Sequence, residues 1–387
     1  MTTNTFNENK SREEVISSRF RGCLYGQAIG DALGLGAEAM TQTEVAQNYP
    51  AGLVHYSDIV QDYHRSRWRQ GDWTDDTDMM LCIADAIIED NDDESANSGH
   101  NSVNDCDNSV DNCHNSVDDC DNNANNRDNS AIDSVERARR SVGTSENATD
   151  SNSSGIKIDY HNIARHFKAW ADGTPMGIGL HTRNVLAFGD YTKKPVQASK
   201  LLWELNNRQA AANGGVMRTS IVGLLPNDVR KNAEEICRLT HYDPRCVGSC
   251  VIVSELIHAL VYSEGAPSFL QIKETAKQYD ERIIEYVDMA YKSDDIAMLM
   301  DDLYAGYTLR TMAVGLWAYW HASSFKDGLL AVVNAGGDAD TNAAVACAIL
   351  GAKFGFDTIP SEYVDGLVRK EQLENVVSKL LHIFVKD

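Results

Sequence analysis

Apolar residues recur along most of the chain at the i, i+3, i+4 and i+7 positions of an α-helix. The alternation of apolar and polar residues that is typical of strands is almost absent. The periodicity predicts helices over 17–33, 77–88, 158–170, 197–205, 228–239, 246–262, 269–289, 303–321, 325–333, 341–354 and 370–385. Those at 303–321 and 341–354 are apolar nearly all round, so we expect both to be buried. The pattern predicts an all-α fold.

A low-complexity segment interrupts this pattern at residues 90–155. It is rich in Asn, Asp and Ser and repeats a seven-residue unit with one Val per unit, which is too few apolar residues for a coiled-coil seam. A metal-binding tract formed by Cys106, Cys113, Cys120 and His114 is the alternative, but the spacing of these residues matches no zinc module. We expect a disordered insertion, because so little apolar surface cannot offset the entropy of ordering. The helical pattern then resumes, so one domain is expected over 13–387.

Composition excludes several classes of function. The 387 residues carry a formal net charge of −22, which argues against a basic surface for nucleic acid or anionic membrane. Nine Cys form no CxxC pair or disulfide framework. The N-terminus lacks a leader pattern, and no stretch approaches eighteen apolar residues. We expect a soluble, cytoplasmic monomer that does not contact membranes.

Two clusters of Asp and Thr stand at the starts of predicted helices, at 71–78 (GDWTDDTD) and 336–341 (GGDADT). One Asp suffices to cap a helix, and further carboxylates repel each other. Mg²⁺, Mn²⁺ or Ca²⁺ would relieve this repulsion, and neither cluster has the Cys or His that zinc prefers. Each cluster alone is explained equally well as a helix cap. The pair at matching positions favours a metal site.

Glycines recur at four-residue steps in the first predicted helix, at Gly22, Gly26, Gly30 and Gly34. Small residues at this spacing form a face that another helix can approach closely, which explains the glycines without a binding function. Asp31 and Glu38 do not fit that explanation. A carboxylate on or just beyond a tightly packed helix is either exposed or functional.

With these residues beside the two clusters, the chain resembles the ADP-ribosylglycohydrolase family, which includes dinitrogen-reductase-activating glycohydrolase and the ADP-ribosyl-acceptor hydrolases. The markers are GDALG at 30–34 with Glu38, WTDDT at 73–77, NGGVMR at 213–218, THYDP at 240–244 and GGDADT at 336–341. The resemblance implies a compact orthogonal helical domain with two Mg²⁺ or Mn²⁺ ions in a central cleft. The metal ligands it implies are Thr74, Asp75, Asp76, Asp338, Asp340 and Thr341.

The resemblance also implies substrate-binding residues. Gly177, Ile178, Gly179 and Leu180 fall where the family holds the substrate diphosphate, a task that suits glycine because backbone amides can approach phosphate oxygens closely. Further contacts are expected from Asn213, Gly214 and His241, although a histidine at a helix end, as His241 is, is more often a capping group than a ligand. Arg218 is expected either to contact substrate or to neutralise buried carboxylates.

One branch of the family uses an acidic residue on arginine linkages at the position of Gly177. Glu38 and Asp31 are therefore the better candidates for the catalytic acid or base in this chain.

The implied activity is a metal-dependent hydrolase that removes ADP-ribose from an ADP-ribosylated protein or small molecule, by cleaving an N- or O-glycosyl bond at the anomeric carbon. The alternative is a non-catalytic relative that binds ADP-ribose or serves as a structural protein, as in lens crystallins. Such a relative would be expected to lose metal ligands, and all six are present. No motif encodes the acceptor, which could be arginine, serine, a nucleic-acid base or a free small molecule.

Overall fold

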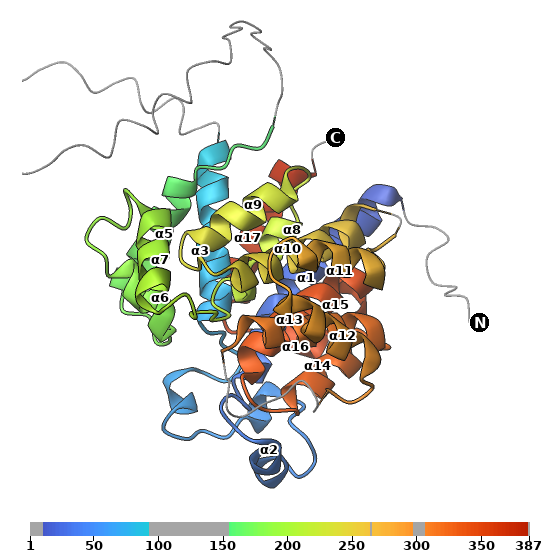
Figure 1. Cartoon of the computed structure of the whole chain (residues 1–387). Coiled ribbons are helices and arrows are strands. Elements are labelled where there is room, and N and C mark those ends of the chain that lie inside the picture. Colours follow the sequence, from blue (N-terminus) through green and yellow to red (C-terminus); the bar gives the residue numbers. More distant parts are fainter. Residues whose placement is uncertain (1–10, 93–154, 264, 297–305, 386–387) are drawn as a thin grey trace, which may run out of the picture. The chain divides into compact units, whose positions relative to one another are not determined.

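Helices dominate the computed structural model, which describes residues 11–92, 155–263, 265–296 and 306–385 (Figure 1). The α-helices are α1 (Arg12–Gly34), α2 (Gln42–Asn48), α3 (Asp75–Asn91), α5 (Tyr160–Asp172), α6 (Leu180–Leu186), α7 (Pro195–Leu205), α8 (Ser220–Gly223), α9 (Val229–Arg238), α10 (Pro244–Tyr262), α11 (Phe269–Lys277), α12 (Arg282–Lys292), α13 (Thr308–His321), α14 (Phe325–Val333), α15 (Ala339–Phe354), α16 (Ser361–Asp365) and α17 (Lys370–Phe384). The 3₁₀-helices are η1 (Tyr56–Asp58), η2 (Arg65–Arg67), η4 (Val216–Arg218) and η6 (Phe356–Thr358). Within these ranges no strand forms beyond isolated bridges, so the all-α prediction is confirmed.

The glycine face of α1 packs against α15. A Cβ built on Gly22 or Gly26 would lie 2.4 or 2.1 Å from the backbone oxygen of Gly351 or Cys347. A Cβ on Gly30 would lie 2.2 Å from that of Ala343. These pairs run in opposite directions along the two helices, so α1 and α15 are antiparallel and in backbone contact. The expected close helix approach is confirmed, and its partner is one of the two helices predicted to be buried.

Several predicted helix boundaries differ from the structure. The first helix begins at Arg12, five residues before its expected start, and α3 extends to Asn91. The helix expected at 269–289 is divided into α11 and α12. Asp280 causes this break, because its Oδ1 accepts hydrogen bonds from the backbone N of Arg282 at 2.9 Å and from the Arg282 Nε at 2.8 Å. The helix expected to start at residue 303 is observed from Thr308, and residue 303 lies outside the described residues. The short helices α2, α6, α8 and α16 span too few residues to show a helical period.

Helix α10 has the length and composition of a membrane-spanning segment, with a mean hydropathy of 1.4. However, 72% of this stretch is buried inside the protein. A core helix passes the same test of length and composition, so α10 is weak evidence for membrane insertion.

The ends of the low-complexity insertion lie next to each other. The Asn91 side chain donates to the Lys157 carbonyl at 2.8 Å and accepts from its backbone N at 2.9 Å. The backbone N of Asp159 donates to the Asp90 carboxylate at 2.6 Å, and α3 packs against α5. Residues 93–154 lie outside the described residues, so the expected disorder, the seven-residue repeat and the domain limits stay predictions.

Candidate active site

The antiparallel packing of α1 and α15 brings Glu38 close to the second Asp cluster. Just beyond α1, the backbone N of Ala39 donates to the Gly337 carbonyl, and the N of Gly337 donates to the Met40 carbonyl, both at 2.7 Å. Gly337 has a φ of +69°, a backbone conformation that favours glycine. This bridge places Glu38 and Asp338, the neighbours of the paired residues, at the same end of the helix pair.

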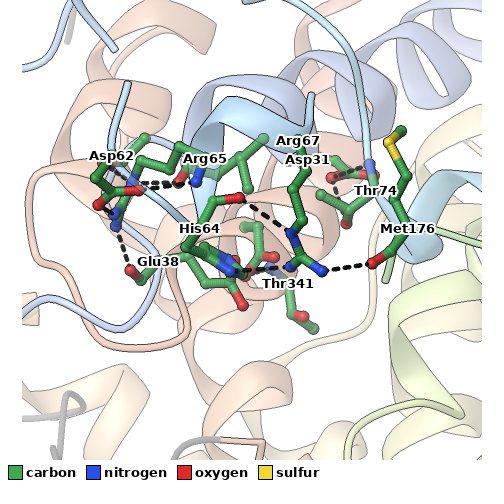
Figure 2. Close-up of polar contacts among 12 residues, drawn as sticks. Asp31, Glu38, Asp62, His64, Arg65, Arg67, Thr74, Met176 and Thr341 are labelled. Atoms are coloured by element: carbon green, nitrogen blue, oxygen red, sulfur yellow. Dashed lines mark hydrogen bonds and ion pairs between the residues drawn. The ribbon is translucent and has the colours of Figure 1, made fainter. Parts of the chain in front are cut away.

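Asp31 joins the first cluster to α1. One carboxylate oxygen accepts from the backbone N and Oγ1 of Thr74 at 2.9 and 2.8 Å (Figure 2). The other oxygen accepts from the N and Oγ1 of Thr77 at 3.0 and 2.6 Å. Asp31 thus caps the N-terminus of α3 from another helix. It is 0% exposed, and this burial raises its pKa to about 7 despite the four hydrogen bonds.

Arg369 holds the outer acids of the same cluster. Its Nε donates to Asp72 at 2.7 Å, one of its terminal nitrogens donates to Asp78 at 2.6 Å, and its guanidinium lies 4.1 Å from the centre of the Trp73 ring. These two carboxylates are therefore neutralised by a residue that directly precedes α17. Asp75 and Asp76 are the two carboxylates of this cluster that Arg369 does not neutralise.

The remaining carboxylates form a repelling group. Burial raises the pKa of Asp75 and of Asp338 to about 6 and that of Asp76 and Asp340 well above its ordinary value, and neighbouring carboxylates add to each shift. None of the four forms an ion pair with a Lys, Arg or His of the described residues. Such a group needs protons or cations to be stable.

A cavity of about 560 Å³ opens beside this group. Its walls contain most of the residues expected from the sequence, namely Glu38, Thr74, Asp75, Gly177, Ile178, Gly179, Leu180, Asn213, Gly214, His241, Asp338, Asp340 and Thr341. Asp31 and Asp76 do not line the cavity and are buried next to it. The structure therefore brings together the two Asp/Thr clusters, the glycine loop and Glu38.

The donor set of these clusters fits a hard divalent cation. In the described parts of the chain no three Asp, Glu, His or Cys side chains are already gathered closely enough to hold a metal ion. The cavity nevertheless offers carboxylate and Thr hydroxyl oxygens, which are the ligands that Mg²⁺ and Mn²⁺ prefer. Asp76 Oδ1 is buried without a hydrogen-bond partner among the described residues, which is costly unless another group binds it.

The glycine loop lies against Asp75. A Cβ at Gly177 would lie 3.1 Å from Asp75 Oδ1 and 3.4 Å from the Trp68 ring, so an acidic side chain there would meet the Asp75 carboxylate. The backbone N–H of Gly179 lies close enough to Asp75 to lower the pKa of that carboxyl, against the larger effect of burial. The loop thus presents backbone to the cavity and has little room for a side chain at Gly177.

Asn213 orients the second cluster. Its side-chain amide donates to Asp338 Oδ2 at 2.5 Å and to Thr311 Oγ1 at 3.0 Å. The backbone N of Gly306 donates to the same Asp338 oxygen at 3.1 Å. Asn213 therefore lines the cavity and also fixes an expected metal ligand.

His241 is held by a buried hydrogen-bond network and has one ring nitrogen, Nε2, without a partner among the described residues. Arg218 donates to the Thr240 hydroxyl at 2.6 Å, and this hydroxyl is 2.7 Å from His241 Nδ1. The Thr240 hydroxyl therefore joins the Arg218 guanidinium to the His241 ring. Within the described chain Nε2 has no partner, and burial holds the pKa of His241 well below its ordinary value.

Arg218 itself does not line the cavity and pairs with no described carboxylate. It fits neither role considered for it from the sequence. It packs 4.4 Å from the Phe167 ring and orients His241 through Thr240.

Sequence reasoning missed a chain of polar contacts that ends on Glu38 (Figure 2). His64 Nε2 lies 2.7 Å from Glu38 Oε2, and Arg67 donates to His64 Nδ1 at 3.0 Å and to the Met176 carbonyl at 2.9 Å. A signal was present in the sequence, since the run HRSRWR at 64–69 is strongly basic in a chain of net charge −22.

Fold and cavity together define an all-α protein in which two Asp/Thr clusters and a glycine loop surround one cavity. A family model described as ADP-ribosylglycohydrolase matches residues 12–155 and 144–387. The chain therefore belongs to the ADP-ribosylglycohydrolase family, and this membership supports a hydrolase that acts on ADP-ribosyl bonds.

Individual relatives are distant but cover nearly the whole chain. It is 23% identical to "ADP-ribosylarginine hydrolase Tri1" of Serratia proteamaculans over 96% of this chain and 81% of that protein. It is also 23% identical to "ADP-ribosyl-[dinitrogen reductase] glycohydrolase" of Rhodospirillum rubrum over 93% of each chain. A solved "ADP-ribosylglycohydrolase-related protein complex" has a TM-score of 0.62 at 20% identity over 96% of this chain and 99% of that chain, which supports the fold.

Proposed function

We propose that this protein is a Mg²⁺- or Mn²⁺-dependent hydrolase that releases ADP-ribose from an ADP-ribosylated acceptor by cleavage at the anomeric carbon. The observation that carries the proposal is the meeting of Glu38, the carboxylate group and the glycine loop in one cavity of about 560 Å³. A diphosphate would be repelled by these carboxylates unless cations neutralised them. The same cations would make the site suitable for both the diphosphate and the ribose hydroxyls.

The expected ligands for the ions are Thr74, Asp75, Asp76, Asp338, Asp340 and Thr341. Bound divalent ions would orient the ribose hydroxyls and lower the pKa of a water molecule. The backbone amides of the loop at 177–180 would hold the diphosphate, and Nε2 of His241 would hydrogen-bond the ligand.

Glu38 would transfer the proton. It is the cavity carboxylate that the packing of α1 against α15 places beside the second cluster, and it is not among the six ligands. Asp31 was the other candidate, but both of its oxygens accept hydrogen bonds from Thr74 and Thr77. The contacts of Asp31 therefore support a positioning role.

We further propose that the preferred linkage is not to arginine. The relatives named above include an ADP-ribosylarginine hydrolase. This chain has Gly177 at the loop position where one branch of the family has an acidic residue, and a side chain there would meet Asp75. Without that acid, the site should cleave an arginine linkage more slowly than a serine linkage.

The proposal is tested by incubating the purified chain with Mg²⁺ or Mn²⁺ and a panel of arginine-, serine-, base- and small-molecule-linked ADP-ribose. We expect release of free ADP-ribose, fastest from an acceptor other than arginine. Glu38→Gln should lower kcat by about 10² to 10⁴-fold, whereas Glu204→Gln on the exposed face of α7 should not change it. Absence of ADP-ribose release from every acceptor would refute the proposed activity.

A further inference from the structure

His64 and Arg67 form a bridge between Glu38 and the glycine loop. The contacts run from the Met176 carbonyl to Arg67 at 2.9 Å, from Arg67 to His64 at 3.0 Å, and from His64 to Glu38 at 2.7 Å. We infer that His64 and Arg67 are positioning residues that hold the Glu38 carboxylate in its working orientation and tie it to the segment that starts at Met176. This inference rests on the proposed function, in which Glu38 transfers the proton.

The direction of each hydrogen bond follows from Arg67. A guanidinium has no acceptor, so His64 Nδ1 must accept from Arg67 and cannot carry a proton. The ring proton is then on Nε2, which donates to Glu38 Oε2. The bridge therefore keeps His64 in one tautomer, and it leaves the second oxygen of Glu38 free to face a ligand.

The backbone around Glu38 is fixed independently. Arg65, which is 4% exposed, donates to the Glu38 carbonyl at 2.5 Å and to the Gly36 carbonyl at 2.9 Å. These contacts hold the main chain but leave the Glu38 side chain free to rotate. Among the hydrogen bonds of the described residues, the one from His64 is the only one that restrains the Glu38 carboxylate.

The charge distribution gives the bridge a physical task. Glu38 lines the same cavity as Asp75, Asp338 and Asp340, so its carboxylate lies among like charges whenever the site holds no cation. Without a restraint, the Glu38 side chain can turn away from the cavity towards solvent. A donor on His64, itself held by the cation Arg67, opposes that movement.

The bridge also meets the loop at a second point. The Arg67 guanidinium lies 4.5 Å from the centre of the Trp68 ring, and Trp68 is the ring that a side chain on Gly177 would touch at 3.4 Å. Arg67 thus contacts the loop directly at Met176 and, through the Trp68 ring, next to Gly177. Glu38 and the loop should act as one unit when a diphosphate binds.

Two amide variants of His64 separate the two halves of the bridge. In His64→Gln the side-chain amide can take the place of Nε2 and donate to Glu38, whereas in His64→Asn it can take the place of Nδ1 and accept only from Arg67. We expect His64→Asn and His64→Ala to lower kcat about tenfold or more, because a misplaced catalytic group costs that much. His64→Gln should stay within about threefold of the wild type, and Arg67→Leu should fall between them.

The decisive measurement is a double-mutant cycle of His64→Ala with Glu38→Gln on the Mg²⁺-loaded chain. If His64 acts through Glu38, His64→Ala should change kcat by less than about twofold in the Glu38→Gln background. His55→Ala is the matched control, since this histidine is half-exposed in the same segment and does not line the cavity. Its kcat should equal that of the wild type.

The outcomes distinguish the two proposals. A wild-type chain without ADP-ribose release refutes the proposed function. An active wild type in which His64→Ala keeps full kcat, or lowers it equally with and without Glu38→Gln, overturns the bridge alone. A His64→Gln variant as slow as His64→Asn would also overturn it, because the donor to Glu38 would then have no importance. Equal melting temperatures of these variants exclude a loss of folding as the cause.

Discussion

Asp31 shows that a side chain can shape this site without lining it. The sequence suggested a catalytic acid, because a carboxylate next to Gly30 did not fit a packing face. The structure shows that its partners are the hydroxyls and amides of Thr74 and Thr77, which lie more than forty positions away in the sequence. A tertiary helix cap of this kind has no local sequence signal. Glu38, the other candidate, lines the cavity.

At the scale of single residues, the buried His241 should make the free energy of unfolding depend on pH. Burial lowers its pKa well below the ordinary 6.5, so below pH 6.5 the unfolded chain binds a proton that the folded chain does not. The free energy of unfolding should therefore fall with decreasing pH, by up to about 1.4 kcal/mol per pH unit from this residue. His241→Asn keeps a polar atom near Thr240 and cannot be protonated, so it should lose less stability.

Urea denaturation at pH 7 and pH 5.5 measures this difference. His55→Asn, at a half-exposed position, serves as the control and should follow the wild type. An identical loss of stability in wild type and His241→Asn would show that His241 is not held neutral by burial.

At the scale of elements, the pairing of α1 with α15 determines where the site lies. The glycine face was visible in the sequence, and so was the apolar character of the segment that became α15. Their mutual contact was not, because a small-residue face specifies close approach but not its partner. The break between α11 and α12 was also not predicted. It depends on hydrogen bonds of the Asp280 side chain, which the spacing of apolar residues does not show.

Gly30→Ala tests the importance of this helix pair. Its Cβ would lie 2.2 Å from the Ala343 backbone oxygen, and backbone cannot yield as a flexible side chain does. We expect the free energy of unfolding to fall by about 1 to 3 kcal/mol or more, and activity to fall because the two ends of the site separate. Gly189→Ala, where nothing lies within 4 Å, should behave as wild type in thermal denaturation. A Gly30→Ala chain with an unchanged melting temperature would contradict the packing.

At the scale of the whole molecule, the sequence revealed those parts of the site that are contiguous. Each Asp/Thr cluster is a short run, so it could be recognised before its partner was located. The bridge to Glu38 could not be recognised in this way, because its contacts join residues 26 and 109 positions apart. The residues of the bridge come into contact only after the chain has folded.

The insertion gives a prediction for the whole chain. Asn91 and Lys157 are hydrogen-bonded to each other, so a short connection can replace the residues between them. Replacing residues 92–152 by a brief Gly/Ser linker should leave the melting temperature nearly unchanged and turnover within about twofold, since a change in loop length alters closure entropy by only about 1 kcal/mol. Loss of folding, or of metal bound to Cys106, Cys113 and Cys120, would reveal a structural role for the repeat.

The central claim is that the two Asp/Thr clusters hold the divalent cations that the hydrolase needs. The most direct measurement is the rate of ADP-ribose release by chelator-stripped protein, before and after Mg²⁺ or Mn²⁺ is added back, for the wild type and for Asp338→Asn. We predict no turnover in the stripped wild type, recovery when the ion returns, and no recovery in Asp338→Asn, because a ligand oxygen has been lost. Full turnover by thoroughly metal-free wild-type protein would contradict the account.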